Sequence, residues 1–266
     1  MKKEFKKIGL LFLFGIMISS CGSDPDPAAS CLPANLQSGL IAFYPFSTGS
    51  LNDASGNGYN LTNSTTATPG PDRAGNATCA FNFVKANGDY LTFQNPTFLN
   101  GFATMPFSIS IWYKPIGTRN VADYELLIGR DRPVSPLIPV HCPDTYGQWS
   151  VGLYDCRRSV IGINDTSLWD GYFDPSICDI TLANLSNFWQ HLVVTSSSSG
   201  LTLYRNGVLT TDPVNSGCIP AGTTLDLGDL FLGKEYTGLL DDVIIYNRVL
   251  SVAEITQLYS LPACCQ

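Results

Sequence analysis

Residues 238–260 read GLLDDVIIYNRVLSVAEITQLYS, and this stretch decides the fold class. It contains a strand-like apolar run from Leu240 to Tyr246, followed by a turn at residues 247–250. Ser251 and Glu254 then form a capping-box pattern, with Ser at the N-cap and Glu three residues later. The stretch therefore predicts a strand, a turn and one short C-terminal helix. Three helix residues are expected to face a sheet: Ile255, Leu258 and Tyr259.

Strand-like runs of the same kind recur upstream, separated by turn residues. They comprise residues 40–44, 90–93, 107–113, 149–154, 160–163, 189–195, 201–204 and 230–233. The runs 149–154 and 160–163 are expected to pair as a hairpin. Asn206-Gly207 predicts a tight turn, because both residues tolerate positive φ. Many short strands with one late helix predict an all-β fold, a two-sheet antiparallel β-sandwich.

Composition narrows the class of protein. The chain has 266 residues, of which 44% are hydrophobic and 14% charged, with a net charge of −7. This composition excludes a coiled coil, collagen and a disordered chain. A nucleic-acid partner is not expected, because binding phosphates requires a basic surface. The length suits one large all-β domain, which we place at residues 31–266.

The first twenty residues have the pattern of a secretory signal peptide, with a basic start and an apolar stretch from Ile8 to Ile18. Ile18-Ser19-Ser20-Cys21 resembles a bacterial lipobox, which implies cleavage before Cys21 and lipidation of its thiol. Residues 21–30 then form a polar tether. We expect the mature chain to be secreted and held at the outer membrane, on the cell surface, through its lipid alone. The alternative is a plain signal peptide followed by a structural cysteine.

Several ordered motifs resemble concanavalin A-like, laminin-G-like jelly-roll domains related to the pentraxins. The matching stretches are residues 39–46, 53–58, 89–91, 107–112, 189–192, 203–207 and 238–251. The resemblance implies a concanavalin A-like jelly roll between about Gly39 and Tyr259. It implies less about function, because the family includes binding, adhesive and enzyme-attached modules.

Asp53-Ala54-Ser55-Gly56-Asn57-Gly58 has oxygen-bearing side chains at alternate positions and Gly at the sixth, as at the start of a calcium loop. The family resemblance implies that Asp241 joins this turn. We therefore predict a structural Ca²⁺ site from Asp53, Asn57 and Asp241. The alternative is an Asx-turn held by its own backbone hydrogen bonds.

Eight cysteines remain after Cys21, an even number that predicts four disulfides in an oxidising compartment. They are Cys31, Cys79, Cys142, Cys156, Cys178, Cys218, Cys264 and Cys265. The family places the chain ends on neighbouring strands, which implies that Cys31 bonds Cys264 or Cys265. Metal binding is the alternative, although the chain has no Cys-x-x-Cys pair.

Residues 131–179 depart from the family pattern and are rich in aromatic and polar residues. Aromatic rings stack on sugar faces, so we predict glycan contacts at Trp169 and Tyr172, with Tyr146 and Trp149 joining them. The alternative is local packing of a disulfide-braced loop. His191 is interpreted as a packed core residue.

Catalysis is not expected. Glycoside hydrolysis requires two carboxyl groups about 5–10 Å apart. After residue 20 the only Glu residues are Glu125, Glu235 and Glu254, and Glu-x-Asp does not occur. Asp170 and Asp174 are near each other in sequence, but nothing orients them. The sequence therefore favours a non-catalytic surface protein that binds an extracellular glycan or glycoprotein. The alternatives are a protein-binding adhesion or scaffold module and a divergent glycan hydrolase.

Overall fold

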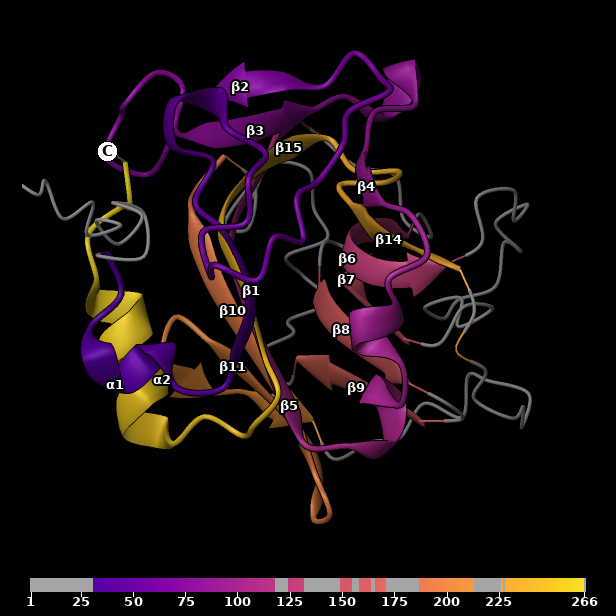
Figure 1. Ribbon diagram of the computed structural model, residues 1–266, viewed down its shortest axis with the longest axis vertical. Coiled ribbons are helices and arrows are strands. Elements are labelled where there is room, and N and C mark those ends of the chain that lie inside the picture. The colour runs from indigo at the N-terminus through magenta and orange to yellow at the C-terminus, as the bar shows by residue number, and fades with distance from the viewer. Residues whose placement is uncertain are drawn as a thin grey trace, which may run out of the picture.

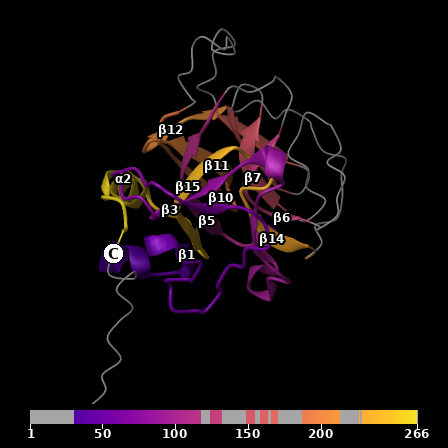
Figure 2. The same ribbon diagram turned by 90° about the horizontal axis from the view of Figure 1, so that it is seen from above.

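The computed structural model describes residues 31–117, 124–131, 149–154, 158–163, 166–170, 187–212, 226 and 228–265. These residues form two antiparallel sheets, called sheet A and sheet B, that stack as a sandwich (Figure 1). The predicted β-sandwich is confirmed. Two short α-helices lie on the side of sheet A that faces away from sheet B (Figure 2).

Sheet A has eight strands in the order β12-β11-β10-β5-β15-β3-β2, with β1 paired to β15. Their bounds are β1 Leu40–Tyr44, β2 Thr68–Gly70, β3 Ala80–Phe83, β5 Phe107–Pro115, β10 Gln190–Ser197, β11 Gly200–Arg205, β12 Val208–Leu209 and β15 Gly238–Tyr246. The predicted turn joins β11 to β12, with φ of 51° at Asn206 and 78° at Gly207. Both residues adopt the left-handed conformation that this turn requires.

Sheet B has seven strands in the order β13-β9-β8-β7-β6-β14-β4. Their bounds are β4 Leu91–Phe93, β6 Glu125–Asp131, β7 Trp149–Tyr154, β8 Arg158–Ile163, β9 Thr166–Asp170, β13 Thr211–Asp212 and β14 Asp229–Leu232. Strands β7 and β8 pair antiparallel, as predicted for their hairpin. The main hydrophobic core lies between the two sheets.

Helical segments are short. The two α-helices are α1 Ala34–Gln37 and α2 Val252–Ser260, and the 3₁₀ turns are η2 Ser47–Gly49, η3 Lys85–Asn87, η4 Thr97–Leu99 and η5 Phe102–Thr104. None of the helices among the described residues combines the length and apolar character that a bilayer crossing requires.

Strand β15 is an internal strand of sheet A that pairs with β1, β3 and β5, and it is buried along its whole length. Leu240 and Val243 contribute to the core between the sheets, whereas Ile244 and Tyr246 contribute to a second core under α1 and α2. Burial on both faces explains why this strand is a nearly continuous apolar run. A bulge interrupts its pairing with β5 after Asp241, and Asp242 there has a φ of 42°.

Helix α2 closes the second core. The predicted capping box is present, since the Ser251 hydroxyl accepts the Glu254 N–H while the Glu254 carboxylate accepts the Ser251 N–H. Ile255 and Leu258 are buried against sheet A as expected. Tyr259 remains 39% exposed and stacks on Trp112 at the margin of this interface.

Candidate functional site

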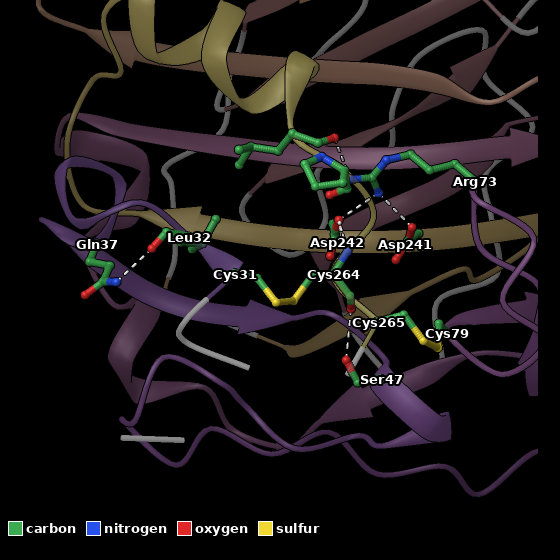
Figure 3. Close-up of a disulfide and its surroundings, with 12 residues drawn as sticks. Cys31, Leu32, Gln37, Ser47, Arg73, Cys79, Asp241, Asp242, Cys264 and Cys265 are labelled. Atoms are coloured by element: carbon green, nitrogen blue, oxygen red, sulfur yellow. Dashed lines mark hydrogen bonds and ion pairs between the residues drawn. A yellow bond between two sulfur atoms is a disulfide. The ribbon is translucent and has the colours of Figure 1, made fainter. Parts of the chain in front are cut away.

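Two carboxylates and one guanidinium meet beneath the C-terminal segment. Asp241 and Asp242 lie at the β15 bulge, and Arg73 comes from the loop between β2 and β3 (Figure 3). Arg73 Nη1 lies 2.8 Å from Asp241 Oδ2 and 2.7 Å from Asp242 Oδ2. Its Nη2 donates to the carbonyl oxygens of Leu261 and Pro262. We call Arg73, Asp241 and Asp242 the C-terminal clasp, because they join the β2–β3 loop, β15 and the C-terminal segment.

The clasp is buried and its charges do not balance. Both aspartates are buried, so two carboxylates face one guanidinium with little solvent. Burial raises the pKa of Asp241 well above its usual range, and the neighbouring Asp242 charge adds to this rise while Arg73 opposes it. Burial also raises the pKa of Asp242. The two carboxyl groups therefore titrate as a pair that retains a proton more readily than exposed aspartates do.

Two disulfides fasten the same segment. Cys31 pairs with Cys264, one of the two partners expected for it, and Cys79 pairs with Cys265 (Figure 3). Consecutive residues near the C-terminus are thus bonded to the start of the α1 segment and to the residue before β3. The Ser47 hydroxyl also donates to the carbonyl oxygen of Cys264. The C-terminal segment is held by two disulfides and by hydrogen bonds from Arg73 and Ser47.

A small pocket beside the clasp contains a buried histidine. The Arg73 guanidinium lies 4.5 Å from the Trp112 ring centroid, and the His191 ring lies 4.9 Å from the same ring. His191 Nε2 is 2.8 Å from the Ser110 hydroxyl oxygen. Burial, reinforced by the charge of Arg73, lowers the pKa of His191 to about 3. The pocket has room for about one water molecule, so it does not fit a sugar.

The predicted calcium residues have other partners in the structure. Asp53 Oδ1 accepts the N–H groups of Phe43 and Ser55, and Oδ2 accepts the Ser55 hydroxyl and the Tyr59 N–H. The Asn57 amide donates to the carbonyl oxygen of Ile41. Asp241 lies against Arg73. These are the contacts of an Asx-turn and of an ion pair, and the calcium site stays a prediction from the sequence.

The predicted glycan residues that the structure describes are buried. Trp149 is 0% exposed and packs on Phe102 and Phe107 in the main core, so its ring cannot stack on a sugar. Trp169 is 6% exposed and is covered by Tyr154 and Arg158. The sequence interpretation of these two tryptophans as glycan contacts was therefore wrong. Trp149 points into the core between the sheets, whereas Trp169 packs with Tyr154 and Val160 in a separate cluster on the other face of sheet B.

Some predictions lie outside the described residues. These are the glycan contacts Tyr146 and Tyr172, the lipidation site Cys21, and the remaining cysteines Cys142, Cys156, Cys178 and Cys218.

Acidic groups that could serve catalysis have structural partners. Asp170 is buried, with its Oδ2 3.3 Å from Arg205 Nε, and its neighbour in sequence, Asp174, lies outside the described residues. Glu254 binds Arg248 and caps α2, and these hydrogen bonds lower its pKa to about 2. Glu235 lies 3.5 Å from Lys85. A carboxylate held by a cation is suited to stability rather than to proton transfer.

Arg73 was missed by sequence reasoning. The available signal was the pair Asp241-Asp242 inside an otherwise apolar strand. Burying two carboxylates is costly unless a cation accompanies them, so this pair already required a partner from elsewhere in the chain.

Comparison of the sequence with family models identifies the family of this chain. The family model described as the concanavalin A-like lectin/glucanases superfamily matches residues 85–256, more than half of the chain. A comparison with curated proteins found no match.

Solved structures with the same fold include binding domains of botulinum neurotoxins. One is of type C, reported with its interaction with two ganglioside molecules (17% identity, 86% of this chain and 53% of that chain, TM-score 0.63). Another is the serotype C1 binding domain (16% identity, 85% of this chain and 52% of that chain, TM-score 0.62). A third is the neurotoxin DC binding domain in complex with rat synaptotagmin II (16% identity, 85% of this chain and 52% of that chain, TM-score 0.59). The present chain spans about half the length of these structures, and the likeness shows the fold alone.

Proposed function

Because the chain belongs to the concanavalin A-like lectin/glucanase superfamily, we propose that it is a non-catalytic binding protein that recognises an extracellular glycan or glycoprotein. The observation that carries this proposal is the jelly roll itself, shared with toxin domains that are described as binding domains. The engagement of Asp170, Glu235 and Glu254 in ion pairs supports a binding role over hydrolysis.

The proposal includes attachment to a membrane through a lipid on Cys21. The lipobox-like sequence before Cys21 supports this part, and a tether of about ten residues reaches at most roughly 35 Å. Cys31, which follows the tether, is bonded to Cys264 beside α1. The α1 side of the domain would then face the membrane, and the opposite side would face outward.

A glycan array tests the binding function. The mature domain, purified as a soluble Cys21→Ser variant, should bind defined oligosaccharides and release no reducing ends from polysaccharides. Binding to none of them at millimolar concentration would refute glycan recognition, and turnover of a polysaccharide would refute the non-catalytic assignment.

Lipid attachment needs a separate experiment in cells. The parent chain should incorporate labelled fatty acid and enter the detergent phase of Triton X-114, whereas the Cys21→Ser variant should do neither. Partition of both chains into the aqueous phase would exclude the lipid anchor and would leave the proposed binding function unaffected.

A protein ligand is the second candidate. It is favoured by the neurotoxin DC domain, which has this fold and was solved in complex with rat synaptotagmin II. Binding to a glycoprotein that survives enzymatic removal of its glycans would favour this candidate over glycan recognition.

A further inference from the structure

Two uncharged stretches of the chain meet along β4, at one edge of sheet B. Residues 54–70 and 90–113 contain no Asp, Glu, Lys or Arg, although the chain has a net charge of −7. Strand β4 is an edge strand, and Thr62 exchanges backbone hydrogen bonds with Thr92 in β4. The fold thus places the two stretches side by side, about 30 residues apart in sequence.

Three aromatic rings form the contact between these stretches. Tyr59 stacks on Phe98 with ring centroids 3.8 Å apart and planes 9° apart. Phe93 meets both rings edge-on, 5.1 Å from Phe98 and 6.0 Å from Tyr59. All three side chains are half-buried, because they pack against the main core and also reach solvent. We call Tyr59, Phe93 and Phe98, with the polar residues between the two phenylalanines, the β4 rim.

Exposed polar side chains flank the rings. Gln94, Asn95 and Thr97 are exposed, and their side chains make no hydrogen bond within the part of the chain that the structure describes. Asn95 has a φ of 48°, and its backbone N–H donates to Asp229 Oδ1 at 2.8 Å, which fixes this turn. The rim therefore presents amides and a hydroxyl from a fixed backbone turn beside aromatic rings.

This combination matches the chemistry of a neutral sugar. A sugar ring has an apolar face of C–H groups, which suits an aromatic ring, and hydroxyls that both donate and accept hydrogen bonds. Amide and hydroxyl side chains likewise both donate and accept. The two stretches offer no cation, and the half-buried Asp229 carboxylate lies at their border. Arg130 Nη1 donates to Asn100 Oδ1, but the Arg130 side chain is only 2% exposed and is paired with Asp226. The Asp229 carboxylate would therefore repel an anionic sugar at this border.

We propose that the β4 rim is a binding site for a neutral sugar unit. This inference rests on the proposed glycan-binding function and supplies its location. Tyr59, Phe93 and Phe98 provide the stacking surface, and Gln94, Asn95 and Thr97 bind hydroxyls.

The test uses the soluble mature domain and a set of rim variants. The triple variant Gln94→Ala, Asn95→Gly, Thr97→Ala removes the polar groups and leaves the rings, with Gly chosen because it tolerates the φ at Asn95. Thr97→Arg blocks the same surface with a bulky cation. The matched control is Thr78→Ala, Asn87→Ala, Ser198→Ala, which removes three exposed polar side chains elsewhere. Unfolding midpoints of all variants should equal that of the parent.

Each domain is applied to an array of neutral, sialylated and sulfated oligosaccharides, and the strongest neutral oligosaccharide is then titrated by NMR. The parent should prefer neutral glycans, with shifts at the side-chain amides of Gln94 and Asn95. The triple variant and Thr97→Arg should bind about tenfold more weakly or worse, and the control should bind as the parent does.

The outcomes separate location from function. Parent binding that both rim variants retain would place the sugar elsewhere and leave the glycan-binding function intact. Parent binding confined to sialylated or sulfated glycans would overturn the assignment of a neutral sugar. If the parent binds no glycan at millimolar concentration, the proposed function fails and the rim site fails with it.

Discussion

The C-terminal clasp and the β4 rim differ in what their polar side chains contact. Those of the clasp are buried against one another, whereas those of the rim face solvent. At the clasp, Arg73 holds two buried carboxylates, and two disulfides fasten the segment above them. At the rim, Gln94, Asn95 and Thr97 are exposed on an uncharged surface. Removing a partner from a buried charge is costly, whereas removing an exposed amide costs little. The clasp is therefore suited to stability, and the rim has polar groups available for a ligand.

The largest expected effect is at the clasp. Arg73→Met should lower the free energy of unfolding by about 3–5 kcal/mol, because it leaves two carboxylates buried without a cation. Urea unfolding followed by circular dichroism measures the loss. Adding Asp241→Asn and Asp242→Asn to Arg73→Met should recover part of the stability, since no charge is then buried. A loss under about 1 kcal/mol for Arg73→Met alone would show that the clasp is dispensable.

The disulfides come next. Replacing both Cys79 and Cys265 by Ser should lower the free energy of unfolding by about 2–4 kcal/mol. With Cys31–Cys264 intact, this second bond closes a ring of only about 50 residues, so its entropic effect is smaller than its sequence separation of 186 suggests. The matched control replaces Cys31 and Cys264. Equal midpoints for the parent and the Cys79/Cys265 variant would contradict this role.

Acid should lower the free energy of unfolding through His191, which lies beside the C-terminal clasp. Its folded pKa of about 3 lies below the ordinary value of 6.5, so the unfolded chain binds a proton first as pH falls. The stability contribution is therefore complete above about pH 6.5 and is lost towards pH 3, at up to about 1.4 kcal/mol per pH unit. The raised pKa of Asp241 acts in the opposite direction, since its contribution falls as pH rises.

His191→Gln isolates the histidine contribution. The difference in unfolding free energy between the parent and His191→Gln should shrink steadily from pH 7 to pH 4. A difference that does not change with pH would mean that His191 does not titrate on unfolding in this range.

A smaller effect is expected at the start of α2. Ser251→Ala removes the hydroxyl that accepts the Glu254 N–H and should cost about 1 kcal/mol. Ser260→Ala, at the other end of the same helix, should change stability by less than about 0.5 kcal/mol. Thermal unfolding of the two variants compares them directly, and equal midpoints would exclude a stabilising cap.

The smallest effect on stability is expected at the rim. The triple rim variant should unfold within about 0.5 kcal/mol of the parent while losing glycan binding. The two measurements together distinguish the rim from the clasp, because a substitution at the clasp lowers the free energy of unfolding. A large loss of stability in the triple variant would mean that the rim is a structural contact like the clasp.

Much of the fold was predictable because its signals are local. Alternating apolar runs, the Asn206-Gly207 turn and the capping box at Ser251 each depend on a few neighbouring residues. The site was less predictable. Trp149 and Trp169 have the residue type of a glycan contact, but their strands direct them into buried positions. Burial depends on the partner strands and cannot be read from the aromatic residue itself.

The amino-acid sequence by itself determined the two-sheet architecture, the closing helix and the need of Asp241 and Asp242 for a cation, because period, turn chemistry and charge are properties of short segments. Only the tertiary structure decided that Arg73, 168 residues from Asp241, is that cation. The stacking of Tyr59 on Phe98 was likewise decided by the fold. Contacts between distant segments depend on strand order and register, which no single segment encodes.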